Sequence, residues 1–396
     1  MDLGRRKIAG WIVAAGLAGH AFFLPVSIAG MQIALAAAAF GLLLAWERPA
    51  RSPLDLPILA FVALAVLSDL WSPYGPPSLG QATLWRAAAG FFVVSAGARR
   101  PRLLLSFAAA GLLLASIAGL VQYRTGIDFV YLLHLRGRHA MVQAPGVPGR
   151  FGAMGFFTSR LGFGHVATVL IALFAGTLAR RRGSWLLAVA AAVAVAAVGV
   201  TFDRAAWLAL CAAAVVIALF AAPQARRAAL AVVAAAAAVV AVVPAIRARF
   251  ATAFSAQANP DRVFIWSRAL EIIRDHPLRG VGFANYQRML GPYYDRVDPH
   301  FFMRTYAHNL ELSTLAETGP LGLLALLWVL GAAFRALWQR RALGGLAALA
   351  AWLAIAQVHD VFYDNKVMYA LWFALGLSLR RPGGSPSPSP PAATAG

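Results

Sequence analysis

The chain has 396 residues, of which 61% are hydrophobic and only 13% charged, and its formal net charge is +20. Soluble domains carry roughly 25% charged residues, because a folded surface needs polar cover. Several runs of about 17–25 apolar residues are long enough to cross a hydrocarbon core of about 30 Å, and they lack the alternation of β-barrel strands. The composition excludes a soluble domain and predicts an all-α, polytopic membrane protein.

Twelve apolar segments are expected to span the membrane. Residues 1–380 are predicted to form one membrane domain, and the Pro- and Ser-rich tail 381–396 is predicted to be disordered and cytoplasmic. The twelve predicted spans have the approximate limits 8–24, 27–46, 54–71, 82–98, 103–122, 157–179, 185–202, 205–222, 228–246, 309–334, 343–360 and 365–380.

The basic residues predict the orientation of these spans. About half of the 35 Lys and Arg residues cluster at alternate span ends, which the positive-inside rule places in the cytoplasm together with both termini. Two long segments, about 123–156 and 247–308, then lie outside the cytoplasm. Most of the remaining basic residues lie in or beside these external segments, where an anionic ligand would explain them. An external site excludes ATP and nucleotide sugars as its expected substrates.

The second external segment is predicted to contain a helix. Asn259 can cap it, Pro260 suits its first position, and His276-Pro277 should end it. A turn is expected at Gly280-Val281-Gly282. Helical spacing gives the helix an apolar stripe, which predicts packing on the bundle or at the lipid interface. The stripe consists of Val263, Trp266, Leu270 and Ile273.

His308 is the first candidate for chemistry. It lies where the external segment turns into a span, so its imidazole is expected at a helix N-terminus near the membrane surface. A neutral imidazole can accept a proton from a hydroxyl, and the helix dipole favours a nearby anion. The alternative is a merely interfacial polar residue. Further along, Gly319 and Gly322 would allow another helix to approach closely, and Pro320 would kink the span.

The motif HN-LELSTLAET-GPLG resembles the O-antigen ligase and O-antigen polymerase superfamily of membrane glycan transferases. The segments DRVFIWSRALEIIRDHPLRGVGFANY, LSDLWSP and TFDRAAWLAL also resemble family motifs, with Asp203 where Ser is commoner. The match of FGAMGFFTSRLGFGHVATVL is loose. The resemblance implies a GT-C-like membrane domain in the bacterial inner membrane, with short helices in a large periplasmic loop.

External arginines are the second candidate site, because the guanidinium fork suits diphosphate. The resemblance implies a glycan donor on undecaprenyl diphosphate, with arginines holding the diphosphate. Anchoring to lipid headgroups stays open as an alternative, chiefly for Arg268, Arg296 and Arg304. Carried over by motif, Arg204 and Arg262 are the first candidates among the arginines, followed by Arg288. Arg160, near the outer end of a predicted span, is a further candidate because buried charge in membranes is usually functional. The expected catalytic residues are thus His308, Arg204 and Arg262, and the expected substrate-binding residues are Arg288, Arg268, Arg160, Asn309, Arg304 and Tyr306.

The hairpin between the last two spans carries His359-Asp360, Tyr363, Asp364 and Lys366. A plain polar hairpin is the favoured interpretation, and orientation of His308 or of the acceptor is the alternative. The external acids form no DxD pair, and no histidines have metal-ligand spacing in the sequence. Phosphate-loop and dinucleotide motifs are also lacking. We therefore expect no metal, no cofactor and no nucleic acid.

The resemblance implies metal-independent, inverting transfer of a glycan from undecaprenyl diphosphate to the lipid A-core of lipopolysaccharide. Polymerisation of O-antigen or exopolysaccharide and protein O-glycosylation are alternatives within the superfamily. A transporter of a lipid-linked anionic glycan is the alternative from another class, although the internal repeat typical of transporters is not apparent. A scaffold subunit of an envelope polysaccharide complex is a third interpretation.

Overall fold

The fold was analysed in a computed structural model of the chain. It describes residues 3–46, 51–73, 83–132, 141–180, 184–227, 229–230, 234, 247, 260–294 and 306–381. Within these ranges the protein is helical and forms no strand; an isolated bridge pairs Gln143 with Phe151. The all-α prediction is therefore confirmed. Asn259, Arg296, Arg304 and the tail after Arg381 lie outside the described residues.

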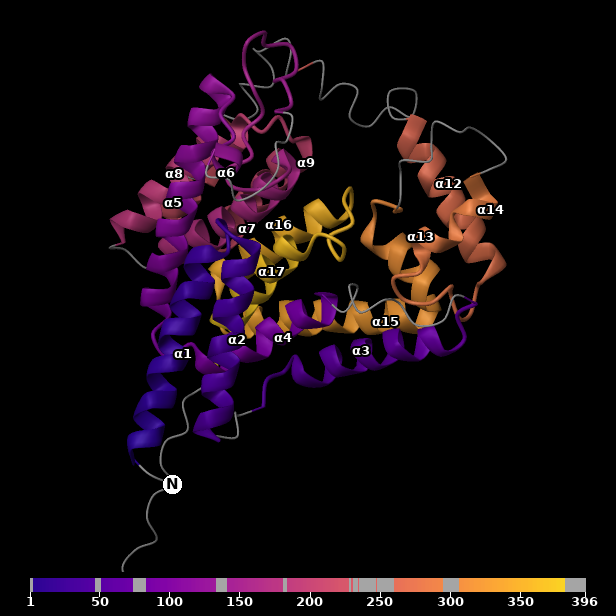
Figure 1. Cartoon of the computed structure of the whole chain (residues 1–396), viewed down its shortest axis with the longest axis horizontal. Coiled ribbons are helices and arrows are strands. Elements are labelled where there is room, and N and C mark those ends of the chain that lie inside the picture. Colours follow the sequence, from indigo (N-terminus) through magenta and orange to yellow (C-terminus); the bar gives the residue numbers. More distant parts are fainter. Residues whose placement is uncertain are drawn as a thin grey trace, which may run out of the picture.

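Helices follow one another with short connections over most of the described chain (Figure 1). They are α1 (Leu3–Phe23), α2 (Ile28–Ala45), α3 (Asp55–Leu70), α4 (Thr83–Gly97), α5 (Pro101–Thr125), α6 (Phe129–Leu132), α7 (Arg160–Leu178), α8 (Trp185–Gly199), α9 (Arg204–Phe220), α12 (Pro260–Asp275), α13 (Tyr286–Met289), α14 (Gly291–Tyr294), α15 (Leu310–Gln339), α16 (Leu343–Ala356) and α17 (Asn365–Ser378).

Eleven of the twelve predicted spans coincide with helices, while the segment 228–246 lies almost wholly outside the described residues. Four of the described helices, α2, α5, α7 and α15, are long and apolar enough to cross a membrane by length and composition. The apolar helices α8, α9 and α16 are shorter, as is the Ala87–Gly97 part of α4. The chain is a membrane protein, and the number of crossings stays a prediction.

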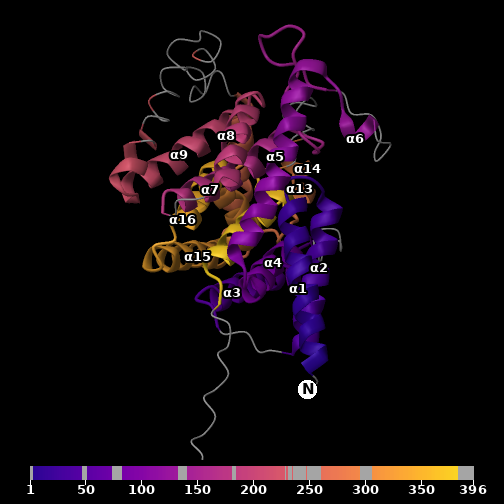
Figure 2. The same cartoon turned by 90° about the vertical axis from the view of Figure 1, so that its left-hand side faces the viewer.

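The centre of the bundle is α7, whose residues are buried almost continuously from Gly162 to Phe174. It packs against α8, α9, α16 and α17, while α17 also contacts α4, and α5 contacts α1 and α8. Figures 1 and 2 show these helices gathered around α7. Because α7 and α17 both begin near the connection between α16 and α17, the polar ends of three helices meet there.

The predicted loop helix is present as α12, and it packs on α15. Figure 1 places α12, α13 and α14 together beside α15, away from α5 and α8. The prediction of which face of α12 is buried was partly wrong. Ile265, Ala269 and Ile272 form the buried stripe, whereas Val263 and Leu270 are 50% and 56% exposed. The helix carries apolar residues on more than one stripe, and the tertiary contacts select the stripe around Ala269.

Helix α15 is interrupted at Gly319, whose backbone is non-helical at φ 69° and ψ −173°. Only glycine adopts such a conformation readily, and the following Pro320 disfavours the helical region for the residue before it. The expected close approach of another helix is therefore wrong. The turn at Gly280 makes the approach instead, because Val281 and Gly282 donate their N–H groups to the carbonyls of Ala316 and Glu317, each at 2.9 Å.

The LSDLWSP segment holds this same turn from the other side. Trp71 Nε1 donates to the Arg279 carbonyl at 3.1 Å, and Ser72 Oγ donates to the Val281 carbonyl at 2.7 Å. Ser68 Oγ accepts from the N–H of Phe283 at 2.9 Å. Three of the segments that carry the family resemblance thus meet at one place, and they fix the part of α15 beside Gly319 relative to α3.

Candidate active site

His308 directly precedes the capping residue of α15. Its backbone is left-handed, with φ 50°, which is uncommon for a residue with a side chain. Asn309 is the N-cap: its Oδ1 accepts from the N–H of Leu312 at 2.9 Å. Asn309 Nδ2 also reaches the carbonyl of Gln357 at 3.4 Å. The expected substrate-binding Asn309 is thus a cap that ties α15 to the loop between α16 and α17.

That loop, residues 357–364, supplies the principal partner of His308. Asp360 Oδ2 accepts from the backbone N–H of His308 at 2.6 Å and lies 3.3 Å from its ring Nδ1. Asp360 Oδ1 accepts from Ser313 Oγ at 2.6 Å. A carboxylate beside Nδ1 makes that nitrogen the protonated one. His308 Nε2 is then the basic atom of the ring, directed away from Asp360.

Asp360 is only 5% exposed, and this burial raises the pKa of its carboxyl from 3.8 to about 6. The hydrogen bonds from Ser313 and from the His308 backbone oppose the rise, as do the charges of His359 and Arg262. At neutral pH the carboxyl is therefore mainly ionised, and it can hold the His308 ring by charge as well as by hydrogen bonding.

His308 is about one-third exposed and borders an open cleft of about 400 Å³. We call this space the His308 cleft. Its rim combines imidazoles, tyrosines, carboxyls and one lysine, so it suits a polar ligand better than a lipid chain. The lining residues are Ile28, Tyr306, His308, His359, Asp360, Tyr363, Asp364, Asn365 and Lys366.

Arg262 of α12 contacts the loop 357–364. Its Nη2 donates to the carbonyl of Val358 at 3.1 Å, and its charge lowers the pKa of Asp360. The structure therefore brings together two of the three expected catalytic residues, His308 and Arg262, through the loop 357–364. The same bond ties the external helix to the α16–α17 hairpin.

Tyr306 and Tyr363 form an aromatic face of the cleft. Their rings are stacked, with centroids 4.2 Å apart and planes inclined by 20°. The Tyr363 hydroxyl donates to Glu317 Oε1, and Glu317 Oε1 also accepts from the Tyr286 N–H. Burial and the charge of Glu317 raise the pKa of Tyr363 well above its usual range. Stacked, uncharged tyrosines of this kind suit the apolar face of a sugar ring.

A second group of polar residues lies behind the cleft, where α9 begins. Asp203 caps α9 by accepting from the Ala205 N–H at 3.0 Å, and its Oδ2 lies 2.8 Å from His165 Nε2. Burial would raise the pKa of Asp203, but the hydrogen bond with His165 and the charges of His165 and Arg160 lower it. Arg160 donates to the carbonyls of Thr201 and Phe202 at 2.7 and 2.9 Å.

Arg204 is the first residue of α9 and is half-buried. It follows Asp203 directly, so the bond between Asp203 and His165 fixes the place of its backbone. The expected catalytic Arg204 and the expected binding residue Arg160 thus lie at one corner, where α7, α8 and α9 meet. This corner adjoins the cleft through His359, whose ring centroid lies 4.6 Å from that of His165.

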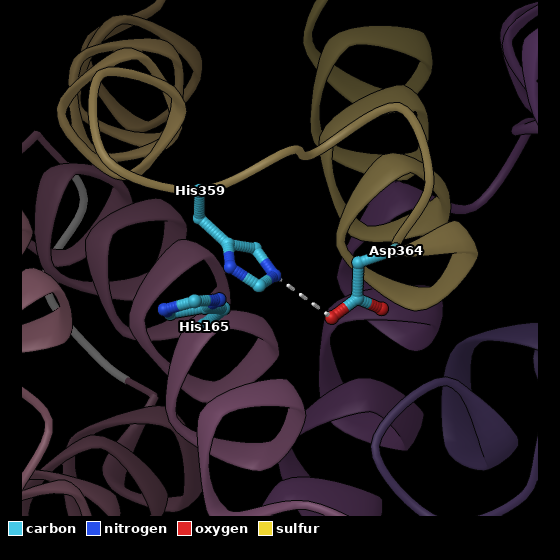
Figure 3. A group of neighbouring side chains, drawn as sticks. All are labelled: His165, His359 and Asp364. Carbon is cyan, nitrogen blue, oxygen red and sulfur yellow. Dashed lines mark ion pairs between the residues drawn. The ribbon is translucent and has the colours of Figure 1, made fainter. Parts of the chain in front are cut away.

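His165, His359 and Asp364 form the one group that could hold a metal ion among the described residues (Figure 3). Their ligand atoms lie within 4.8 Å of one another, and His359 Nε2 is 3.7 Å from Asp364 Oδ2. Burial would raise the pKa of Asp364, yet the His359 bond and the nearby Lys366 charge lower it. The carboxylate is therefore already compensated by cationic side chains, and the absence of a metal requirement stays a prediction.

Two other expected binding residues, Arg288 and Arg268, lie on α13 and α12. Arg288 is exposed on α13 and donates to Asn285 Oδ1 at 3.2 Å. Arg268 pairs with Glu271 at 2.7 Å and lies 5.3 Å above the Phe264 ring. Their roles in binding substrate stay predictions, as does that of Arg304.

Sequence reasoning ranked Asp360 below the arginines and missed His165 altogether. Asp360 is 52 positions from His308, and no local spacing indicates that the two would meet. The available signal was a His-Asp pair in a short external hairpin, which the hydrophobic pattern alone cannot distinguish from a solvated turn. His165 lies within an apolar helix and gave no signal.

A family model described as O-antigen ligase matches residues 192–327. This part of the chain is thus similar to the O-antigen ligase family. This result confirms the resemblance to the O-antigen ligase and polymerase superfamily. The matched part runs from within α8 to within α15, so it includes Arg204, Arg262 and His308. Asp360 and the rest of loop 357–364 follow the matched O-antigen ligase segment and complete the cleft from outside it. No curated protein matches the chain.

Proposed function

We propose that this protein moves a glycan from undecaprenyl diphosphate to the lipid A-core of lipopolysaccharide. The O-antigen ligase domain indicates a membrane glycosyltransferase-like enzyme acting on lipid-linked glycans. One observation carries the proposal further. Within that domain, His308 is held by the buried Asp360 at an open polar cleft, with Arg262 beside the same loop.

The reaction is a direct displacement at the anomeric carbon of the donor. His308 Nε2 removes the proton from the acceptor hydroxyl, and the hydroxyl oxygen forms the new bond to that carbon. The bond from the carbon to the diphosphate oxygen breaks, and its electron pair stays on the diphosphate. A single displacement inverts the anomeric centre. Asp360 acts as the positioning residue that keeps Nδ1 protonated and Nε2 available.

Cationic side chains stabilise the negative charge that builds on the departing diphosphate. Arg262 and Arg204 have this role in the proposal, because preorganised charges next to a leaving group lower the barrier without further reorganisation. Lys366 adds a positively charged ammonium group to the cleft. Tyr306 and Tyr363 offer a stacking face to a sugar unit. No metal takes part.

The proposed setting is the bacterial inner membrane, with the cleft on the periplasmic face and both termini in the cytoplasm. The alternation of basic clusters along the sequence supports this orientation. The positions of the helix N-termini are consistent with this orientation. Helices α7, α9, α15 and α17 all begin close to the cleft residues or to the Asp203 corner. Their polar starts are thus gathered on one side.

Reconstitution in proteoliposomes tests the proposal. The purified protein receives a glycan on undecaprenyl diphosphate, with lipid A-core in one reaction and no added acceptor in the other. Glycan attached to lipid A-core supports the ligase reaction. Longer chains formed without that acceptor establish a polymerase instead, and movement of the donor across the bilayer without any new glycosidic bond establishes a transporter.

A further inference from the structure

A second cavity, of about 870 Å³, lies among helix ends that are remote from the His308 cleft. The ends of α5, α7, α8, α15, α16 and α17 surround it. We call it the arginine cavity. Asp and Glu are absent from the described residues that line it, whereas six arginines are present: Arg102, Arg180, Arg340, Arg341, Arg380 and Arg381.

Among the described residues, one acidic side chain, that of Asp55, pairs with an arginine of this cavity. Arg381 pairs with Asp55 at 2.7 Å, and Arg340 donates to the carbonyl of Arg380 at 3.0 Å. The side chains of Arg102, Arg180 and Arg380 are exposed. Like charges that share a small space repel one another, so an anion that enters the cavity lowers the free energy of the whole group.

The wall of the cavity adds further groups that favour an anion. Helices α5, α8 and α16 begin there, with Pro101, Ser184 and Leu343 among the lining residues. None of these three helices has a side-chain hydrogen bond at its N-cap. Their first N–H groups add a positive potential to that of the arginines. The arginines carry the argument, and the helix ends reinforce it.

The level of the cavity in the bundle indicates what kind of anion enters. Helix α7 begins with Arg160 near the cleft and ends at the cavity after 19 residues. At 1.5 Å per residue this is about 28 Å, close to the thickness of a hydrocarbon core. Trp185 and Trp338, at the same helix ends, are 75% and 49% exposed. Exposed tryptophans are typical of the membrane–water interface, so the cavity lies at headgroup level.

We propose that the arginine cavity binds the phosphate headgroup of an anionic phospholipid, on the face of the membrane opposite the His308 cleft. Scattered basic residues would be sufficient for the orientation of the spans. Here six of them, from four helix ends, surround one cavity. The cavity volume of about 870 Å³ leaves room for a headgroup, and the adjoining exposed apolar residues Leu103 and Phe107 can contact its acyl chains.

Lipid binding to the full-length protein in detergent tests the proposal by native mass spectrometry. The probes are dioleoyl phosphatidylglycerol, dioleoyl phosphatidylcholine and sodium pyrophosphate. The cavity variant combines Arg102→Gln, Arg180→Gln and Arg380→Gln. The matched control combines Arg226→Gln, Arg227→Gln and Arg335→Gln, which removes the same charge from exposed residues after α9 and on α15 that do not line the cavity.

We expect one phosphatidylglycerol to bind saturably and phosphatidylcholine not to bind. At about 1 kcal/mol per basic residue, the cavity variant should weaken the Kd roughly 100-fold, and Arg180→Gln alone roughly fivefold. The control variant should leave it within about threefold. Equal losses in the cavity and control variants would show diffuse attraction and overturn the proposal. Pyrophosphate binding as tightly as the lipid would overturn it too, in favour of a soluble anion.

Discussion

The His308 cleft and the arginine cavity differ in how far their charges are balanced. In the His308 cleft each acid has a basic neighbour: Asp360 contacts His308, and Asp364 contacts His359. Behind the cleft, Asp203 contacts His165 in the same way. In the arginine cavity all charged residues of the described lining are arginines. A balanced network holds each side chain in place, as a reactive group requires, whereas an unbalanced one attracts an external anion. The following predictions test whether chemistry belongs to the first cavity alone.

Replacing the base itself should have the largest effect. His308→Ala removes the group that accepts the acceptor's proton, and a positioned base contributes typically about 10²–10⁴-fold. We expect transfer to fall by that factor in the proteoliposome assay, with normal elution on size exclusion. Near-normal transfer in this variant would remove His308 from the mechanism.

Neutralising the partner of His308 comes next. Asp360→Asn keeps the shape of the side chain but no longer offers a carboxylate to Nδ1, so the ring can adopt the wrong tautomer. We expect transfer to fall by about 10²-fold or more. Asn365→Asp, at another residue of the cleft, serves as a control that changes charge without touching this pair. A loss in the control but not in Asp360→Asn would refute the positioning role.

The guanidinium geometry is tested by a substitution that keeps the charge. Arg204→Lys should lower transfer by roughly tenfold, because an ammonium cannot grip a diphosphate through two parallel hydrogen bonds. The rate at saturating donor and the donor KM are both to be measured. If Lys serves equally well, the site needs only positive charge. The His308 cleft and the arginine cavity would then differ in how their charges are balanced, and not in the hydrogen-bond geometry of their arginines.

Acidification should inactivate the enzyme through Asp360. Its pKa is raised to about 6, so the ionised fraction, and with it the rate, falls about tenfold for each pH unit below that value. Stability changes in the other direction: the folded protein holds this proton more tightly, and that contribution is lost as the pH rises through about 6. A pH profile of transfer that is flat from 7 to 5 would contradict this role of Asp360.

Removing metal should have the smallest effect. His165, His359 and Asp364 could hold an ion, but Lys366 and the histidines already compensate Asp364. Transfer after EDTA treatment and gel filtration should therefore stay within about twofold of the untreated protein. Loss of activity that zinc or manganese restores would show instead that the cleft is a metal site.

The fold was largely predictable because the membrane imposes long apolar runs. Eleven predicted spans match helices, and α12 begins at Pro260 and ends just before His276, as its capping residues indicate. The side of α12 that is buried was less predictable. The helix has more than one apolar stripe that could be buried. Its contacts with α15 bury the stripe that contains Ala269, and Leu270 stays exposed.

The site was predictable only in part, for a similar reason. His308 and Arg262 were found because motifs mark them, and the structure brings both to one loop. The role of Asp360 is visible only in the structure, where the connection between α16 and α17 lies beside the start of α15. A pairing across 52 positions leaves no trace in local spacing. Gly319 was taken for a packing glycine, although its backbone shows a break that admits the Gly280 turn.

The central claim is that glycan transfer depends on the His308 cleft and not on the arginine cavity. One experiment compares wild type, His308→Ala and the variant combining Arg102→Gln, Arg180→Gln and Arg380→Gln in the same proteoliposomes. Glycan transferred from undecaprenyl diphosphate to lipid A-core is measured. We predict a loss of at least about 10²-fold for His308→Ala and less than about threefold for the cavity variant. Comparable losses in both, or retained transfer in His308→Ala, would contradict the account.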